Sequence, residues 1–192
     1  GNSYAGISSK TTWNFTTEDV TDPTVTAYSP TDNATAVGIN ANLVLTFSEP
    51  VTAQSDSVYI KHSSDDSPFE TIWVGDARLT GSGTNTITVN PSGTFAGQTG
   101  YYVQVHATAF DDLAGNSYAG IADNSTWNFT TEDVTNPTVS SLSPPDNATA
   151  VLVNTDLVIT FTETVTAETG DIRIKRTSND AIFETIAVTS PR

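Results

Sequence analysis

Acidic side chains gather at three places along the chain, and their oxygen atoms are the ligands that Ca²⁺ prefers. One place precedes the first Asp-Pro pair, one follows a run of alternating apolar residues, and one lies in a stretch rich in Asp and Gly. The candidate ligands are Glu18, Asp19, Asp22, Glu49, Asp111, Asp112 and Asn116. Because Ca²⁺ takes about six to eight oxygen ligands, their convergence would make a calcium site.

A second, incomplete set repeats the pattern further along the chain, at Glu132, Asp133, Asn136 and Glu163. The counterparts of Asp111 and Asp112 would lie beyond Arg192. The competing interpretation is that Asp and Asn simply favour turns, and that the acidic residues keep an exported protein soluble. Both interpretations stay open at the level of sequence.

Other reactive chemistry is sparse. Of the two histidines, His62 is replaced by Arg176 in a repeated segment described below, and His106 is expected on a solvent-exposed strand face. No nucleophile elbow, zinc spacing or phosphate-binding loop occurs. We therefore expect a protein that is not an enzyme. Tyr59 and Trp73 could form a sugar-stacking platform, which keeps a carbohydrate- or protein-binding adhesin module as an alternative function.

The chain repeats itself with an offset of 114 residues. GNSYAG occurs at Gly1 and Gly115, and PTV followed by DNATAV begins at Pro23 and again at Pro137. Residues 1–21 match 115–135 at 17 of 21 positions, and residues 22–78 match 136–192 at 30 of 57. This predicts the last strand of one repeat (1–21), a complete repeat (22–135) and the first half of a third (136–192).

Alternating apolar residues predict strands throughout, with no helix of ten or more residues. Leu43, Leu45 and Phe47 share one face, and Val58 with Ile60 does the same further on. About seven such strands fill one repeat: 24–28, 42–47, 57–61, 70–74, 86–89, 101–105 and 127–131. We expect an all-β, immunoglobulin-like (fibronectin-III-like) β-sandwich in tandem repeats.

In that strand order, the loop after the second strand would carry Glu49, and the loop before the last strand would carry Asp112. Both loops would meet the linker at one end of the sandwich, so a bound Ca²⁺ would fix the linker to the next repeat. The segment 13–17 is expected to form a strand like its copy 127–131. The three tryptophans, Trp13, Trp73 and Trp127, are expected in the core.

The motifs PTVTAYSPTDNATAV, LTFSEPV, FDDLAGNSYAG and WNFTTED together resemble the bacterial Ig-like repeat of S-layer proteins and large RTX-type surface adhesins. The resemblance spans the whole repeat, although FTETV replaces FSEPV in the third copy and keeps only the acid, Glu163. It implies a β-sandwich that serves as a spacer in extracellular or cell-surface proteins. Many such arrays are rigidified by calcium.

The net charge is −15, from 22 acidic and 7 basic residues, which argues against nucleic acid as a partner. No apolar run is long enough to insert into a bilayer. We expect neighbouring repeats of the same chain as partners. The incomplete repeats at the two ends allow two explanations: the chain is a slice of a longer array, or neighbouring copies complete each other by strand exchange into a fibre.

Overall fold

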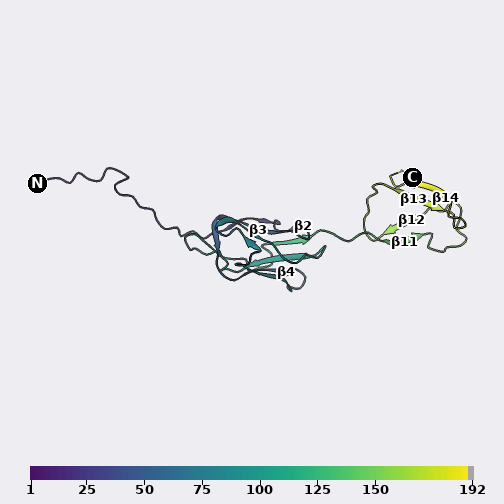
Figure 1. The fold of residues 1–192 in the computed structure, drawn as a ribbon, viewed down its shortest axis with the longest axis horizontal. Coiled ribbons are helices and arrows are strands. Elements are labelled where there is room, and N and C mark those ends of the chain that lie inside the picture. The colour runs from purple at the N-terminus through teal and green to yellow at the C-terminus, as the bar shows by residue number, and fades with distance from the viewer. Residues whose placement is uncertain (190–192) are drawn as a thin grey trace. The chain divides into compact units, whose positions relative to one another are not determined.

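The computed structural model describes residues 1–189, and it divides into two compact units, Gly1–Val134 and Thr135–Arg192. These residues contain strands and turns but no helix, and hence no helix that could cross a membrane. The all-β class expected from the sequence is confirmed (Figure 1).

Two five-stranded sheets form the first unit. The first sheet has the order β1-β3-β7-β6, and β9 pairs with the far part of β3. Its strands are β1 (Val25–Ser29), β3 (Leu43–Ala53), β6 (Leu79–Thr80), β7 (Thr84–Val89) and β9 (Phe110–Asp112).

The second sheet has the order β2-β10-β8-β4-β5. Its strands are β2 (Ala34–Val37), β4 (Ser57–His62), β5 (Pro68–Trp73), β8 (Gly100–Val105) and β10 (Asn128–Thr131). The chain crosses from one sheet to the other between β1 and β2, and β2 then lies parallel to β10, the last strand. This arrangement is the immunoglobulin-like sandwich.

The core of the first unit lies between the two sheets. Alternation along β3 buries Leu43, Leu45 and Phe47, as predicted, and Val58 with Ile60 does the same in β4. Phe129 of β10 and Trp127, the residue just before β10, complete it, and the Trp127 ring stacks on Tyr28 with the ring centroids 4.8 Å apart. This packing holds the strand ends that carry the acidic residues.

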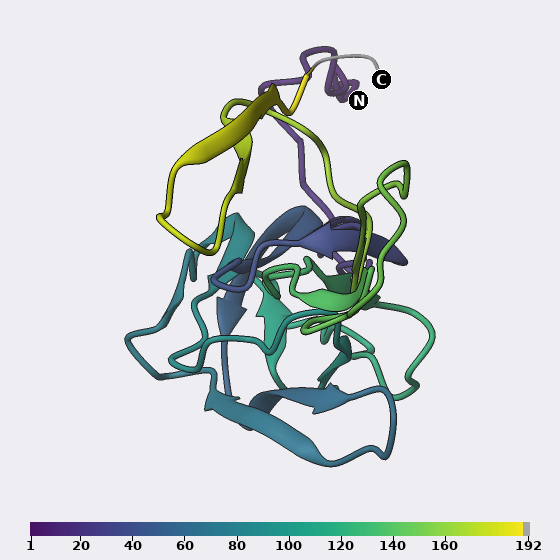
Figure 2. The ribbon, with the colours of Figure 1, turned by 90° about the vertical axis from the view of Figure 1, so that its right-hand side faces the viewer.

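The second unit contains two hairpin-like strand pairs. These are β11 (Val139–Ser143) with β12 (Val158–Phe161), and β13 (Asp171–Lys175) with β14 (Ile182–Ala187), the yellow pair in Figure 2. Leu157, the counterpart of the fully buried Leu43, is 62% exposed. The face that forms the core in the first unit is therefore open to solvent here.

Several expectations from the sequence are wrong. Residues 13–17 form no strand, and Trp13 is 71% exposed because its segment has no sheet to join (Figure 1). Trp73 is 58% exposed, since its neighbours Ile72 in β5 and Val74 just after it point into the core. The loop expected after Phe47 is absent, because β3 continues to Ala53.

Candidate metal site

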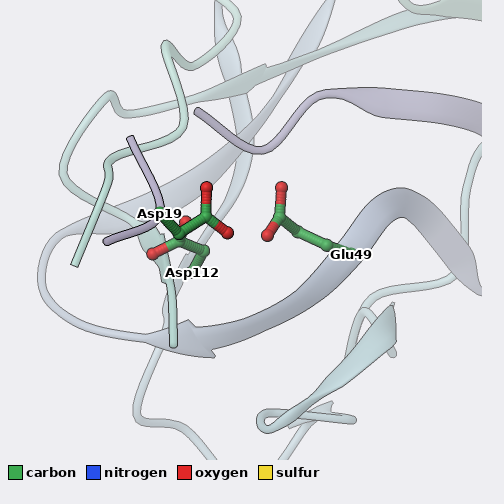
Figure 3. Close-up of side chains that lie close together, drawn as sticks. All are labelled: Asp19, Glu49 and Asp112. Carbon is green, nitrogen blue, oxygen red and sulfur yellow. The ribbon is translucent and has the colours of Figure 1, made fainter. Parts of the chain in front are cut away.

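Three carboxylates from distant parts of the chain meet at one end of the first unit. Asp19 lies on the linker, Glu49 on β3 and Asp112 at the end of β9. One oxygen of each lies within 4.8 Å of the others. Figure 3 shows the Glu49 carboxylate pointing from the β3 ribbon toward those of Asp19 and Asp112.

A bend in β3 brings Glu49 into this cluster. The pairing between β3 and β7 shifts register between Thr46 and Val51, and Val51 then lies opposite Asp112 of β9. Pro50, which has no N–H to donate, lies inside this irregular stretch. Glu49 therefore projects from a bent strand, and the expectation that it lies in a loop is corrected.

The turn that follows β9 holds Asp112 in place. Its Oδ1 accepts hydrogen bonds from the backbone N–H groups of Ala114 (2.8 Å), Gly115 (2.6 Å) and Asn116 (2.8 Å). Gly115 has a φ of +98°, which favours glycine and lets the turn fold back over the carboxylate. Asp112 is consequently buried, with 3% of its surface exposed.

Asn116 connects this turn to the linker. Its Nδ2 donates to Asp112 Oδ2 at 2.7 Å and to the backbone oxygen of Asp19 at 3.3 Å. The linker is thereby positioned with Asp19 next to the two other carboxylates. Asn116 thus belongs to the site as a residue that orients Asp19 and Asp112.

The pKa values of Glu49 and Asp112 in this cluster are shifted in opposite directions. Desolvation by burial, together with the charges of Asp19 and Asp112, raises the pKa of Glu49. Burial alone would also raise the pKa of Asp112, but hydrogen bonds from Asn116, Gly115 and Ala114 hold that pKa below its usual value. A cation between the three carboxylates would relieve the repulsion that acts on Glu49.

The donor atoms fit a hard cation such as Ca²⁺, because they are all carboxylate oxygens. The other expected ligands of the first junction, Glu18, Asp22 and Asp111, are not part of this group of three. Asp111 instead forms an isolated bridge with Ser117, and its backbone oxygen accepts from Thr52 Oγ1 at 3.3 Å.

The second junction stays a prediction. Glu132 uses its Oε1 to accept from the backbone N–H of Ile39 at 3.1 Å, within the first unit. Asp133 also belongs to the first unit, whereas Asn136 and Glu163 belong to the second.

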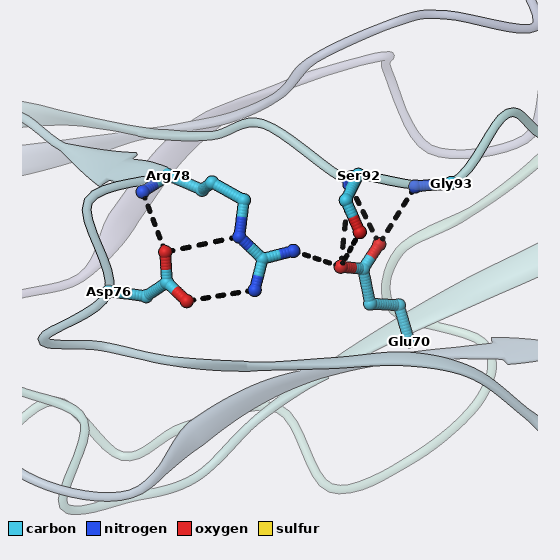
Figure 4. A network of polar contacts seen from close by, with 5 residues as sticks. All are labelled: Glu70, Asp76, Arg78, Ser92 and Gly93. Carbon is cyan, nitrogen blue, oxygen red and sulfur yellow. Dashed lines mark hydrogen bonds and ion pairs between the residues drawn. The ribbon is translucent and has the colours of Figure 1, made fainter.

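A second polar network, which the sequence did not indicate, has a structural role. Arg78 donates to Asp76 Oδ2 at 2.8 Å and to Glu70, and Glu70 also accepts from Ser92 Oγ at 2.7 Å and from the backbone of Gly93 at 3.4 Å (Figure 4). The network fastens β5 to the turn after β7. Because its partners are separated by up to 23 residues, no local sequence pattern could reveal it.

The expected aromatic platform also has a place in the fold. Trp73 lies opposite Ser57 and Tyr59 lies opposite Thr71 in the β4–β5 pair, so the two aromatic side chains share the outer face of the sheet as diagonal neighbours. Tyr59 donates its hydroxyl to Asp56 at 2.6 Å. The counterparts in the other repeat are Arg173 and Ala187, so the platform is not repeated.

Comparisons with solved structures give distant likenesses. CopC from Methylosinus trichosporium OB3b is 13% identical with a TM-score of 0.42, covering 59% of this chain and 97% of CopC. The S-layer protein rSbsC is 17% identical (TM-score 0.37), and the N-terminal part of SbsC is 15% identical (TM-score 0.38). The match to rSbsC covers 83% of this chain and 21% of rSbsC. The match to the N-terminal part of SbsC covers 88% of this chain and 41% of that structure. At these scores they carry no conclusion about function.

No curated protein matches the sequence. The bacterial Ig-like domain family matches residues 19–131 and, a second time, residues 133–191. The two matched segments together span nearly the whole chain, and the first coincides with the sandwich that carries the three carboxylates. The chain belongs to the bacterial Ig-like domain family.

Proposed function

We propose that the chain is a structural spacer of an extracellular bacterial surface protein, in which Ca²⁺ fixes the linker to the repeat that follows it. Membership of the bacterial Ig-like family supports the role of a structural module. The repeat of whole segments at a 114-residue offset supports an array of similar units, and Pro23 and Pro137 stiffen the short connections between them. A high negative charge fits a protein that works outside the cell in the presence of divalent cations.

The observation that carries the calcium proposal is the meeting of Asp19, Glu49 and Asp112 within 4.8 Å. Two of these carboxylates belong to the sandwich and one belongs to the linker. A cation bound by all three would reduce the freedom of the linker and fix the direction in which the chain enters the repeat. In an array this would turn flexible beads into a stiffer stalk.

Thermal unfolding in chelator and in Ca²⁺ tests the proposal. A cation that binds only the folded state stabilises it by about 2.7 kcal/mol at a concentration of 100 times the dissociation constant. We expect the melting temperature of the chain to rise by several degrees when Ca²⁺ replaces EDTA. Equal melting temperatures in millimolar Ca²⁺ and in EDTA would contradict the calcium site.

Two matched variants locate the site. Glu49→Gln removes a carboxylate of the cluster, and Glu18→Gln removes an acidic residue from the same linker outside it. We expect the response to Ca²⁺ to disappear in the first variant and to persist in the second. The same response in both variants would place the cation elsewhere.

A ligand-binding adhesin module is the second candidate, supported by the exposed outer face that Trp73 and Tyr59 share. Titration with a panel of soluble glycans, followed by tryptophan fluorescence, distinguishes it from a spacer. Saturable quenching that Trp73→Ala abolishes and Trp13→Ala leaves intact would favour the adhesin module.

A further inference from the structure

The chain leaves the first unit through a short segment that stays bound to the sandwich beyond its last strand. β10 ends at Thr131, yet the first unit continues to Val134. The backbone N–H of Glu132 donates to Val37 O at 2.8 Å, and Glu132 O accepts from the N–H of Gln98 at 2.9 Å. The main chain of Glu132 is therefore held on both sides, by the end of β2 and by the turn before β8.

The side chain of Glu132 adds a third contact. Its Oε1 accepts from the backbone N–H of Ile39 at 3.1 Å. A Cβ added at the neighbouring Gly38 would lie 3.7 Å from the same Oε1, which is an ordinary contact distance. Hydrogen bonds to a carboxylate are among the stronger ones in proteins, so this bond ties the outgoing chain to the segment after β2.

Gly97 allows a fourth contact because it has no side chain. A Cβ at this position would lie 2.6 Å from Val134 Cγ2 and 3.2 Å from Glu132 O. Carbon atoms that are not bonded are most stable about 3.5–4.0 Å apart, so the outgoing chain occupies the space that a side chain would fill. The φ of Gly97 is not positive, so its role is close approach rather than an unusual backbone conformation. Val134 remains exposed on its other side.

The entry of the chain into the same unit uses a different side chain of the same short sequence. Glu-Asp-Val occurs at residues 18–20 and again at residues 132–134. At the entry, the middle residue Asp19 brings its carboxylate to the candidate metal site. At the exit, the outer two residues, Glu132 and Val134, contact the sandwich. These exit contacts are made between protein atoms alone.

We propose that a repeat of this kind fixes its outgoing chain through these protein contacts, without a metal ion, and its incoming chain through the cation. The proposal rests on the spacer role proposed above and divides the stiffening of the chain into two independent parts. Gly97 and Glu132 are the positioning residues of the exit. Removal of Ca²⁺ then loosens the entry of a repeat and leaves its exit in place.

Hydrogen exchange of single backbone amides, followed by NMR on the full chain in EDTA and in Ca²⁺, tests the proposal. The Gln98 amide reports on the main chain of Glu132, and the Ile39 amide reports on its carboxylate. Because exchange is slow only where local opening is costly, we expect both amides to be protected, with rates that agree within about twofold between the two conditions. Protection that requires Ca²⁺, or no protection in either condition, would overturn the proposal.

Variants at the two positioning residues should affect the two amides separately. Gly97→Ala places a methyl group against Val134 and should speed exchange at Gln98 by about tenfold, because overpacking weakens a close contact. Adding Val134→Ala to Gly97→Ala removes the nearest methyl group and should recover most of the protection. Glu132→Ala should speed exchange at Ile39, whereas Glu132→Gln keeps an acceptor oxygen and should retain the protection.

Gly38→Ala is the matched control, because its added Cβ meets the same segment at an ordinary distance. It should leave both amides as they are in the unaltered chain. The Val103 amide, which donates to Trp127 O at 2.9 Å, reports on opening of the whole sandwich. In the Gly97→Ala chain, unchanged exchange at Gln98 would overturn the proposal, as would equal acceleration at Gln98 and Val103, which would mean a global loss of stability. The melting experiments above test the calcium site separately, so its failure and that of the exit contacts are distinguishable.

Discussion

At the scale of single residues, Glu49 and Asp112 show how neighbouring carboxyl groups can have opposite effects on stability. Asp112 is surrounded by N–H donors, and its charged form is favoured in the folded protein. Glu49 is half-buried beside two other acids, and its charged form is disfavoured. Within the cluster, the electrostatic repulsion acts mainly on Glu49, and a bound cation would relieve it.

This difference predicts opposite pH dependences in the absence of Ca²⁺. A carboxyl group whose pKa is raised by folding stabilises the folded state at pH values below its pKa in the unfolded chain, which is near 4.3 for Glu. This stabilisation is lost as the pH rises through the pKa of the folded state. In EDTA at pH 7, Glu49→Gln should therefore raise the melting temperature. At about pH 3.5 the difference from the unaltered chain should vanish, because Glu49 is then protonated in both states.

Asp112→Asn is the counterpart variant. Folding lowers the pKa of Asp112, so this residue stabilises the folded state at pH values above its pKa in the unfolded chain, near 3.9. The stabilisation is lost as the pH falls through the pKa of the folded state. The variant should melt several degrees lower than the unaltered chain at pH 7, and the difference should shrink in acid. Thermal melts from pH 3.5 to 7 check both signs, and a Glu49→Gln chain that melts lower at pH 7 would contradict the assignment of repulsion to Glu49.

At the scale of secondary-structure elements, the segment 126–134, which contains β10, and its exposed copy 12–20 allow the contribution of packing to stability to be measured. Trp127→Ala removes a fully buried indole, its stacking on Tyr28 and its hydrogen bond to Pro30. We expect a loss of about 3–5 kcal/mol in the free energy of unfolding of the first unit. Trp13→Ala, in identical local sequence, should change it by less than about 0.5 kcal/mol.

Urea denaturation followed by circular dichroism measures both values. The pair separates propensity from packing, because the nine residues around each tryptophan are the same. Equal losses in the two variants would mean that the segment 13–17 also packs on the sandwich.

The sequence predicted those elements whose apolar residues alternate without interruption. Leu43, Leu45 and Phe47 were correctly placed in the core for this reason. The alternation stops at Glu49 and Pro50, so the continuation of β3 to Ala53 could not be anticipated. That continuation depends on pairing with β9, a contact about 60 residues away along the chain.

The candidate site was predictable only in part, for a similar reason. Acidic residues near Asp19, Glu49 and Asp112 were identified from their chemistry. Which acid of each group points inward depends on local geometry: Asp112 is buried by its own turn, whereas its neighbour Asp111 bridges to Ser117. Trp73 was misplaced because residue type was given more weight than the phase of its strand, in which Ile72 faces the core.

At the scale of the whole molecule, the same strand sequences give a complete core in the first unit and an open face in the second. Leu157, Ile159 and Phe161 line an open groove, whereas their counterparts on β3 are buried. In the first unit, the opposite sheet, which contains β10, β8 and β4, covers that face. Stability is therefore expected to be concentrated in the first unit.

Limited proteolysis of the dilute full chain checks this distribution. A protease needs a locally opened segment, and opening costs least where few apolar side chains are buried. Chymotrypsin should therefore cleave first after Trp13 and Phe15, and after exposed residues of the second unit such as Leu157 and Phe183. Mass spectrometry should then show a resistant fragment that retains about residues 18–134, and Ca²⁺ should slow cleavage after Phe15, the chymotrypsin site that precedes Asp19. Early cleavage inside the first unit, at Phe110 or Trp127, would mean that its two sheets do not form one cooperative core.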